Sequence, residues 1–126
     1  MQAPKDRRKL GRIGEDIAAD YLACKGYRVL ARNYRRNGAE IDIICRESDG
    51  CLVFVEVKSR TYSTFGQGFE AVGHTKQARI VQASMSYISE HNITDDDIRY
   101  DVISITLGGG DSGNSIEHIP NAFDAR

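Results

Sequence analysis

Three charged residues lie inside two apolar segments that have the composition of β-strands. Asp42 falls in residues 40–45, and Glu56 and Lys58 fall in residues 52–58; both segments are otherwise rich in Ile, Val and Phe. Strands favour β-branched and aromatic side chains and disfavour Asp, Glu and Lys. Charges at these positions therefore constrain both how the segments pair and what the paired segments do.

The turn between the two segments predicts which residues face each other. Residues 48–50 have the sequence Ser-Asp-Gly, which is typical of a hairpin turn. If the turn is centred on Asp49, antiparallel partners have numbers that sum to 98, so Asp42 lies opposite Glu56 and Glu40 lies opposite Lys58. Side chains two apart share a face, so all four charges would point to one side. A register shifted by one residue would instead separate the two acids.

Two carboxylates that lie directly opposite each other need a nearby positive charge to offset their repulsion. Cβ atoms of directly opposed residues are roughly 5 Å apart, and like charges at that distance destabilise a hairpin. A divalent cation would compensate Asp42 and Glu56, because Mg²⁺ (or Mn²⁺) binds carboxylate oxygens and completes its coordination with water and substrate phosphate. Lys58 would stand beside it. The alternative is a solvated face with a Glu40/Lys58 ion pair and two exposed acids.

Composition places the chain among soluble globular proteins. Its 126 residues, 40% hydrophobic and 28% charged, suit a single domain with one core. No apolar run approaches the roughly 18 residues of a membrane span, and the N-terminus has no apolar signal core, so we expect a cytoplasmic location and no membrane partner. The three cysteines form no C-x-x-C pair, which argues against a disulfide framework or a zinc site.

The near-neutral net charge hides an asymmetry. Residues 1–36 carry ten Lys/Arg against four Asp/Glu, whereas residues 37–126 carry seven against fourteen. Basic clusters can neutralise nucleic-acid phosphates, and that electrostatic attraction supplies most non-specific affinity. We expect a basic N-terminal arm at about residues 1–10 and a loose tail at about residues 120–126. A solvated arm without a partner is the alternative.

Periodicity and turn residues predict an α/β chain. Apolar residues recur at helical spacing in two segments, and β-branched alternation marks the strands; Gly and Ser separate them. The expected helices are residues 11–25 and 76–91, the expected strands are residues 27–33, 40–45, 52–58, 98–107 and 115–119, and the main loops are residues 61–75 and 108–114.

Two helices offer further candidates for a site. Glu15 falls at the edge of the apolar arc of the first helix, so it is the acid of that helix best placed to reach the sheet, although a surface carboxylate near a helix N-terminus is the simpler reading. Lys76 and Arg79 project from the first turn of the second helix, where backbone N–H groups favour an anion. Solvated cations are the alternative there.

The chain resembles the YraN-like family of uncharacterised bacterial proteins over nearly its whole length. The motifs that carry the resemblance are Gly14-Glu15, Gly26-Tyr27, Arg32-Asn33-Tyr34, Glu40-Ile41-Asp42, residues 53–58, Phe65-Gly66, Lys76 and Asp101-Val102. That family is similar to archaeal Holliday junction resolvases, within the restriction-endonuclease-like superfamily with the signature PD-(D/E)xK. Ile41 replaces the signature proline, and Ala39 stands where relatives often have glycine. The resemblance implies a restriction-endonuclease-like mixed β-sheet with a central hairpin flanked by α-helices.

The resemblance also implies a metal-dependent DNA endonuclease that acts on branched or structured DNA. Its metal ligands would be Asp42, Glu56 and the backbone carbonyl of Val57, with Lys58 acting on the attacking water and Glu15 completing the site. The residues expected to contact the DNA backbone are Arg12, Arg60, Lys76 and Arg79. Paired cuts in a junction would require a two-fold homodimer. A non-catalytic nucleic-acid-binding module and a protein-interaction domain are the alternatives.

Overall fold

A computed structural model describes residues 7–62, 72–108 and 113–125. All seven expected helices and strands are present in this part of the chain, whereas Gly66 and Gly68 of the expected loop lie outside it. The elements are α1 (Arg7–Cys24), β1 (Arg28–Arg36), β2 (Ala39–Arg46), β3 (Leu52–Thr61), α2 (His74–Glu90), β4 (Ile98–Leu107) and β5 (Ser115–Phe123).

Both ends of the chain carry more regular structure than the sequence indicated. Helix α1 begins at Arg7, so residues 7–10, which we expected in a basic arm, are helical, and Leu10 packs against the core. Strand β5 continues to Phe123, so residues 120–123 of the expected loose tail are strand. The aromatic ring of Phe123 stacks on Tyr100 with ring centroids 5.2 Å apart, and this contact extends β5 beyond its short β-branched stretch.

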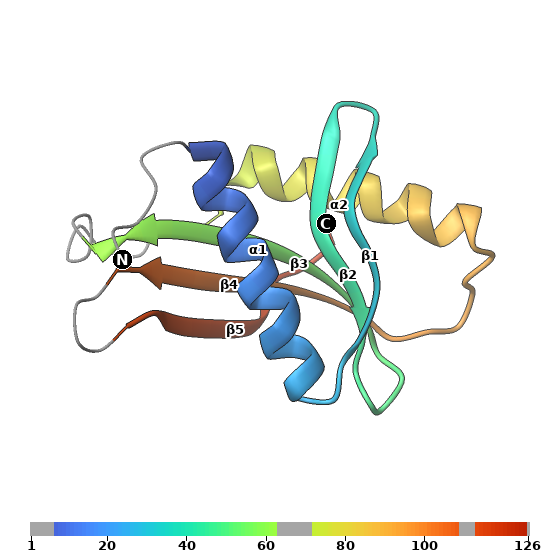
Figure 1. The fold of residues 1–126 in the computed structure, drawn as a ribbon. Helices are drawn as coiled ribbons and strands as arrows, with labels where there is room; N and C mark the ends of the chain where they lie inside the picture. The colour runs from blue at the N-terminus through green and yellow to red at the C-terminus, as the bar shows by residue number, and fades with distance from the viewer. Residues whose placement is uncertain (1–6, 63–71, 109–112, 126) are drawn as a thin grey trace.

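The five strands form one mixed sheet in the order β1-β2-β3-β4-β5. Every neighbouring pair is antiparallel except β3 and β4, which are parallel and are connected through α2. Helix α1 crosses one face of the sheet and α2 runs behind the other (Figure 1). The expected mixed β-sheet with a central hairpin flanked by α-helices is confirmed.

The core consists of two layers, one on each face of the sheet. On the α2 side, Phe54 packs against Tyr87 and Tyr100. On the α1 side, Leu22 packs with Val53 and Val55 of β3 and with aliphatic residues of β2 and β4. Odd-numbered residues of β3 therefore face α1 and even-numbered residues face α2, which directs Glu56 and Lys58 towards the α2 side. Neither helix within the described ranges is long and apolar enough to cross a membrane.

Two glycines, one within α1 and one just after its end, determine how the helix meets the sheet. A Cβ at Gly14 would lie 1.8 Å from Ser59 Oγ, so only glycine lets α1 approach β3 this closely. Gly26 has a φ of +91° and ends the helix, as expected, while Tyr27 N–H donates to the Leu22 carbonyl at 2.9 Å. The hydrogen bond from Tyr27 to Leu22 directs the chain from the end of α1 into β1.

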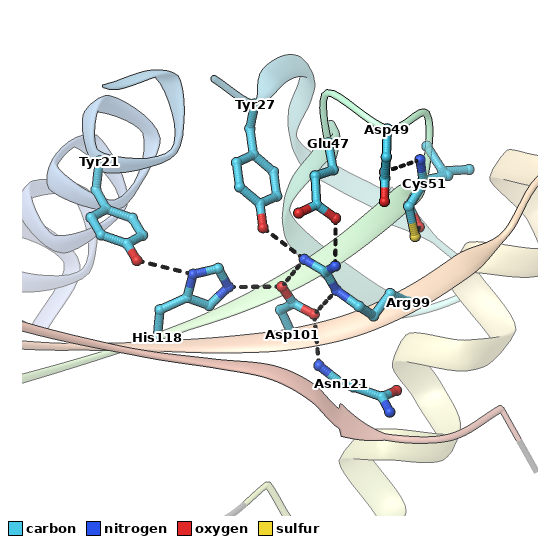
Figure 2. A network of polar contacts seen from close by, with 10 residues as sticks. Tyr21, Tyr27, Glu47, Asp49, Cys51, Arg99, Asp101, His118 and Asn121 are labelled. Carbon is cyan, nitrogen blue, oxygen red and sulfur yellow. Dashed lines mark hydrogen bonds and ion pairs between the residues drawn. The ribbon is translucent and has the colours of Figure 1, made fainter. Parts of the chain in front are cut away.

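A buried carboxylate joins β4 to β5 and to α1 (Figure 2). Asp101 is fully buried and accepts hydrogen bonds from Arg99 Nε at 2.8 Å, from His118 Nε2 at 2.7 Å and from the Asn121 backbone N–H at 2.9 Å. Because an ionised carboxylate only accepts, His118 carries its proton on Nε2, and its Nδ1 is the partner of the Tyr21 hydroxyl at 3.1 Å. Burial alone would raise the pKa of Asp101, but these donors outweigh it and hold the pKa below its usual range.

Candidate functional site

Strands β2 and β3 separate where the acidic residues lie. The predicted register is confirmed in the four pairs of the described ladder, Arg46–Leu52 to Ile43–Val55, whose numbers sum to 98. Beyond Ile43 the alternation of β2 breaks, because Ile41 packs in the α2-side layer and Ile43 packs in the α1-side layer. Asp42 lies at this break, one residue beyond the last pair of the ladder.

The side chain of Asp42 takes over the role of a strand partner. Its Oδ2 accepts a hydrogen bond from the Val57 backbone N–H at 2.7 Å. The N–H and C=O of one strand residue point to the same edge, so the Val57 carbonyl also faces the gap that β2 leaves. Asp42 therefore lies beside the backbone of Val57 at the point where the strands diverge, beyond the last pair of the hairpin ladder.

The expected pairing of Glu40 with Lys58 is wrong. Glu40 pairs with Arg35 of β1, and the Arg35 Nε lies 3.3 Å from Glu40 Oε2. The ladder between β2 and β3 has ended before this point, so Glu40 follows β1 away from Lys58. The four charges therefore do not form the single row on one face that the simple hairpin predicted.

Asp42 and Glu56 nevertheless lie against each other. Burial raises the pKa of Asp42 to about 9, and the hydrogen bond with Glu56 and the charge of Glu56 act in the same direction. The Val57 N–H acts in the opposite direction, and the charge of Glu15 adds to the increase. In the absence of a cation, the Asp42 carboxyl therefore resists ionisation.

Glu56 is the most buried acid of the site. Its side chain is only 5% exposed, and Lys76 Nζ lies 3.0 Å from its Oε2. This is an ion pair by distance, but no hydrogen bond of good geometry reaches Oε2 from the described side chains. The contact is therefore an electrostatic ion pair whose angles fall outside those of a hydrogen bond. Oε2 consequently keeps an acceptor for a further ligand.

Asn33 connects two more carboxylates to this centre. Its Nδ2 donates to Glu15 Oε1 at 2.7 Å and to Glu40 Oε1 at 3.0 Å. Asn33 has a φ of +52°, a left-handed conformation that is unusual inside a strand. One carboxylate oxygen each from Glu15, Glu40 and Asp42 lie within 4.8 Å of one another. The prediction that Glu15 reaches from α1 to the sheet acids is confirmed.

Asn33 and Glu40 were missed as site residues. Both residues stand in motifs of the family resemblance, but Asn33 is a poor strand former within the expected first strand and Glu40 was placed opposite Lys58, so neither was assigned to the site. Their significance depends on the end of the β2–β3 ladder and on the backbone of Asn33. Neither can be read from local periodicity.

The acids line a surface pocket of about 320 Å³ together with two cations. Its lining residues are Gly38, Ala39, Glu40, Asp42, Glu56, Lys76, Arg79 and Ile80. A slightly larger pocket of about 370 Å³, which includes His74 and Gln77 in its lining, has Asp124 as the single acid among its described lining residues. The chemistry therefore favours the smaller pocket.

Three other predicted site residues are not among the described residues that line this pocket. Lys58 is half-buried on the α2-facing side of β3 but is not among the described lining residues. Arg12 is exposed on α1, one turn before Glu15. Arg60 Nε donates to Thr106 Oγ1 at 3.1 Å, so this side chain is held against β4. Of the four residues expected to contact DNA, only Lys76 and Arg79 are among the described residues that line the pocket.

The donor set fits a hard divalent cation. Carboxylate oxygens of Asp42 and Glu56 and the carbonyl of Val57 are the ligand type that Mg²⁺ and Mn²⁺ prefer. Two observations support the fit: the acceptor of Glu56 without a hydrogen bond, and the raised pKa of Asp42, which added positive charge would lower. Glu15 lies near enough to Asp42 to hold a coordinated water or to bind directly.

Comparison with known proteins identifies relatives across bacteria. The family model "Uncharacterised protein family UPF0102" matches residues 14–105. A UPF0102 protein of Trichlorobacter lovleyi is 43% identical over 120 residues, covering 95% of this chain and 94% of the relative. One from Sulfurihydrogenibium sp. is 42% identical over 118 residues, covering 94% of this chain and 96% of the relative. The YraN-like resemblance is confirmed.

Among solved structures, the chain is similar to Pyrococcus furiosus SfsA, described in complex with Ca²⁺. The sequence identity is 14% and the TM-score is 0.40, and the match covers 94% of this chain and 65% of that chain. The chain thus spans somewhat less than two thirds of that protein's length. At this level the two proteins share at most a general arrangement of helices and strands.

Proposed function

The chain belongs to the uncharacterised protein family UPF0102, and we propose that it is a metal-dependent endonuclease that hydrolyses phosphodiester bonds in branched or structured DNA. The observation that carries the proposal is the convergence of Asp42, Glu56 and the Val57 backbone at the point where β2 leaves β3. A buried carboxyl pair is costly to maintain and contributes nothing to the core. Such a pair is best explained by a ligand that it binds.

The three oxygen donors would hold one Mg²⁺ or Mn²⁺. When bound, the cation would polarise the scissile phosphodiester and offset the negative charge that develops on its oxygens. The hydrogen bond from Val57 fixes Asp42, and burial in the α2-side layer fixes Glu56, so neither carboxylate needs to reorganise before binding. The backbone hydrogen bond is thus a positioning contact as well as a structural one.

The remaining polar residues would act on water and on the substrate. Lys58, from the same face of β3 as Glu56, would orient the attacking water or accept its proton. Glu15, held by Asn33 at 2.7 Å, would hold that water from the α1 side. The water oxygen forms the new bond to phosphorus, and the bond to the leaving sugar oxygen breaks.

Cations around the pocket would bind the DNA backbone. Arg79 lines the pocket, and Arg12 lies on α1 together with Arg7, Arg8 and Lys9 of the same helix. Contacts of this kind depend on the shape of the DNA and on salt, and carry no base information. Paired cuts across a four-way junction would additionally require a two-fold symmetric dimer.

Nicking of labelled DNA tests the proposal. We expect the purified protein to nick a four-way junction or a flap with Mg²⁺ or Mn²⁺ and to be inactive in EDTA. Asp42→Asn keeps an acceptor for the Val57 N–H, so it should remain folded and lose nicking by about a hundredfold or more. Lys58→Met should behave in the same way. Variants as active as the parent would assign the activity to a contaminating nuclease.

Binding of DNA without turnover is the second candidate. Lys58 is absent from the described lining of the pocket. Lys76 neutralises the charge of Glu56, so the site does not need a metal ion to balance that charge. A binding module would show affinity that falls steeply with salt and no nicking with Mg²⁺ or Mn²⁺. The same Asp42→Asn variant would then bind DNA as well as the parent does.

A further inference from the structure

Lys76 occupies an electrostatically unfavourable place in its helix. It lies in the first turn of α2, where the helix dipole disfavours a positive charge. This helix has no acidic residue in its first turn, and its N-cap, Gly73, makes no side-chain hydrogen bond. The local sequence therefore gives no reason for a lysine here. The compensating charge comes from Glu56, which belongs to β3.

The ion pair with Glu56 places the ammonium group inside the acidic pocket. Lys76 Nζ lies 3.0 Å from Glu56 Oε2, and both residues line the pocket together with Asp42. Oε2 is also an oxygen that a divalent cation would use. A cation of charge +2 and an ammonium group at the same oxygen would repel each other strongly in a partly buried site.

From this competition we infer that Lys76 is a built-in counter-ion, which leaves Glu56 when a divalent cation binds and then contacts a phosphate oxygen of the DNA. This inference rests on the proposed function. The Lys76 side chain is 55% exposed, so it can turn outwards without unpacking the core. Its new position would be next to Arg79, which lies one helical turn further along α2.

The exchange of partners links metal binding to substrate binding. Before the metal binds, Lys76 neutralises Glu56 and is not available to the DNA. After the exchange, the same charge adds to the phosphate-binding surface of α2. The protein would therefore bind DNA more tightly with metal than without it, and part of that gain would depend on Lys76.

Metal affinity tests the inference independently of cleavage. Lys76→Met removes the competing charge and keeps a side chain of similar length, so we expect Mn²⁺ to bind at least about fivefold more tightly, as measured by calorimetry and by the Mn²⁺ electron paramagnetic resonance signal. Arg79→Met removes the same charge from the same pocket, from a residue outside the Glu56 ion pair. It should tighten Mn²⁺ binding by less than Lys76→Met does. Lys76→Arg, which keeps the charge, should not tighten it.

A DNA-binding measurement completes the design. Adding Mn²⁺ to the parent should strengthen binding to an uncleaved phosphorothioate junction, and Lys76→Met should lose most of that increase. If Lys76→Met binds Mn²⁺ no more tightly than Arg79→Met, or if it keeps the full metal-dependent gain in DNA affinity, the inference is wrong. A parent that binds Mn²⁺ but never nicks DNA would refute the proposed function alone, since the Mn²⁺ affinities still decide the role of Lys76.

Discussion

The carboxylate of Asp42 accepts a hydrogen bond from the backbone N–H of Val57 at 2.7 Å, in the gap that opens after the last ladder pair of β2 and β3. One side chain thereby closes the open edge of β3 and presents an acid to Glu56. The structural and the proposed catalytic roles of Asp42 are combined in this contact, and substitution can separate them.

Substitutions of Asp42 should separate the two roles. Asp42→Asn keeps the acceptor for Val57 and is neutral, as the carboxyl itself is at neutral pH when its pKa is raised to about 9. Its metal-free stability should therefore stay near that of the parent. Asp42→Ala leaves the N–H without a partner and should lower the free energy of unfolding by about 1–3 kcal/mol. Urea unfolding in EDTA measures both, and equal destabilisation by Asn and Ala would contradict this account.

The close approach of α1 to β3 predicts opposite effects for two glycines of one helix. Gly14→Ala would place a methyl group 1.8 Å from Ser59 Oγ, so it should destabilise the protein by about 1–3 kcal/mol despite the better helix propensity of alanine. Gly11→Ala is the matched control, because a Cβ there meets no atom within 4 Å. It should stabilise by about 0.5–1 kcal/mol. Thermal unfolding of the two variants is sufficient, and a stabilising Gly14→Ala would refute the close packing.

The Asp101 network predicts loss of stability in acid. Hydrogen bonds from His118, Arg99 and Asn121 depress the pKa of Asp101 in the folded protein. A depressed pKa stabilises the fold above the unfolded value of about 3.9, and this contribution is lost as the pH falls through the folded pKa. Asp101→Asn should destabilise the protein at pH 7 by roughly 3 kcal/mol, because Arg99 loses its buried partner.

The control for this prediction is the slope of stability against pH. Urea unfolding between about pH 3 and pH 6 should show a flatter acid limb for Asp101→Asn than for the parent. Glu117→Gln, in the same strand as His118 and exposed, should leave the slope unchanged. An identical acid limb in the parent and in Asp101→Asn would show that other carboxylates control acid unfolding.

The left-handed backbone of Asn33 predicts a difference between glycine and alanine. Both substitutions remove the bridge between Glu15 and Glu40, but alanine alone adds the cost of a φ of +52°. Asn33→Ala should therefore be about 1 kcal/mol less stable than Asn33→Gly. Both should lower nicking by about tenfold, because Glu15 loses its positioning contact. Equal stability of the two variants would argue against the left-handed conformation.

The sequence predicted the hairpin register correctly because a three-residue turn and two uniformly apolar strands leave few alternatives. Ser48-Asp49-Gly50 determined the pairs from Ile43–Val55 to Arg46–Leu52. It could not predict where pairing stops, because pairing ends where Ile41 and Ile43 of β2 pack in different layers, and the sequence pattern does not show that break. For that reason Glu40 was placed opposite Lys58 and lies instead beside Arg35.

Residues far apart in the sequence were the least predictable part of the site. Glu15 was expected there from its place on the helical arc, but Asn33 acquires its bridging role only through a φ that strand periodicity does not reveal. Lys76 was expected to contact phosphate, but it pairs with Glu56, which lies twenty residues earlier in the sequence. The sequence does not show that α2 packs on the face of β3 that carries Glu56. Propensity contains no information about such pairs.

A crystal of the protein soaked in Mn²⁺ shows whether a cation binds between Asp42 and Glu56, because anomalous scattering locates the ion without any assay. We expect one anomalous peak in contact with carboxylate oxygens of both residues, at roughly 2.0–2.5 Å from each. That peak should vanish in Asp42→Asn. No peak at millimolar Mn²⁺, or a peak that contacts neither of these two acids, would contradict this expectation.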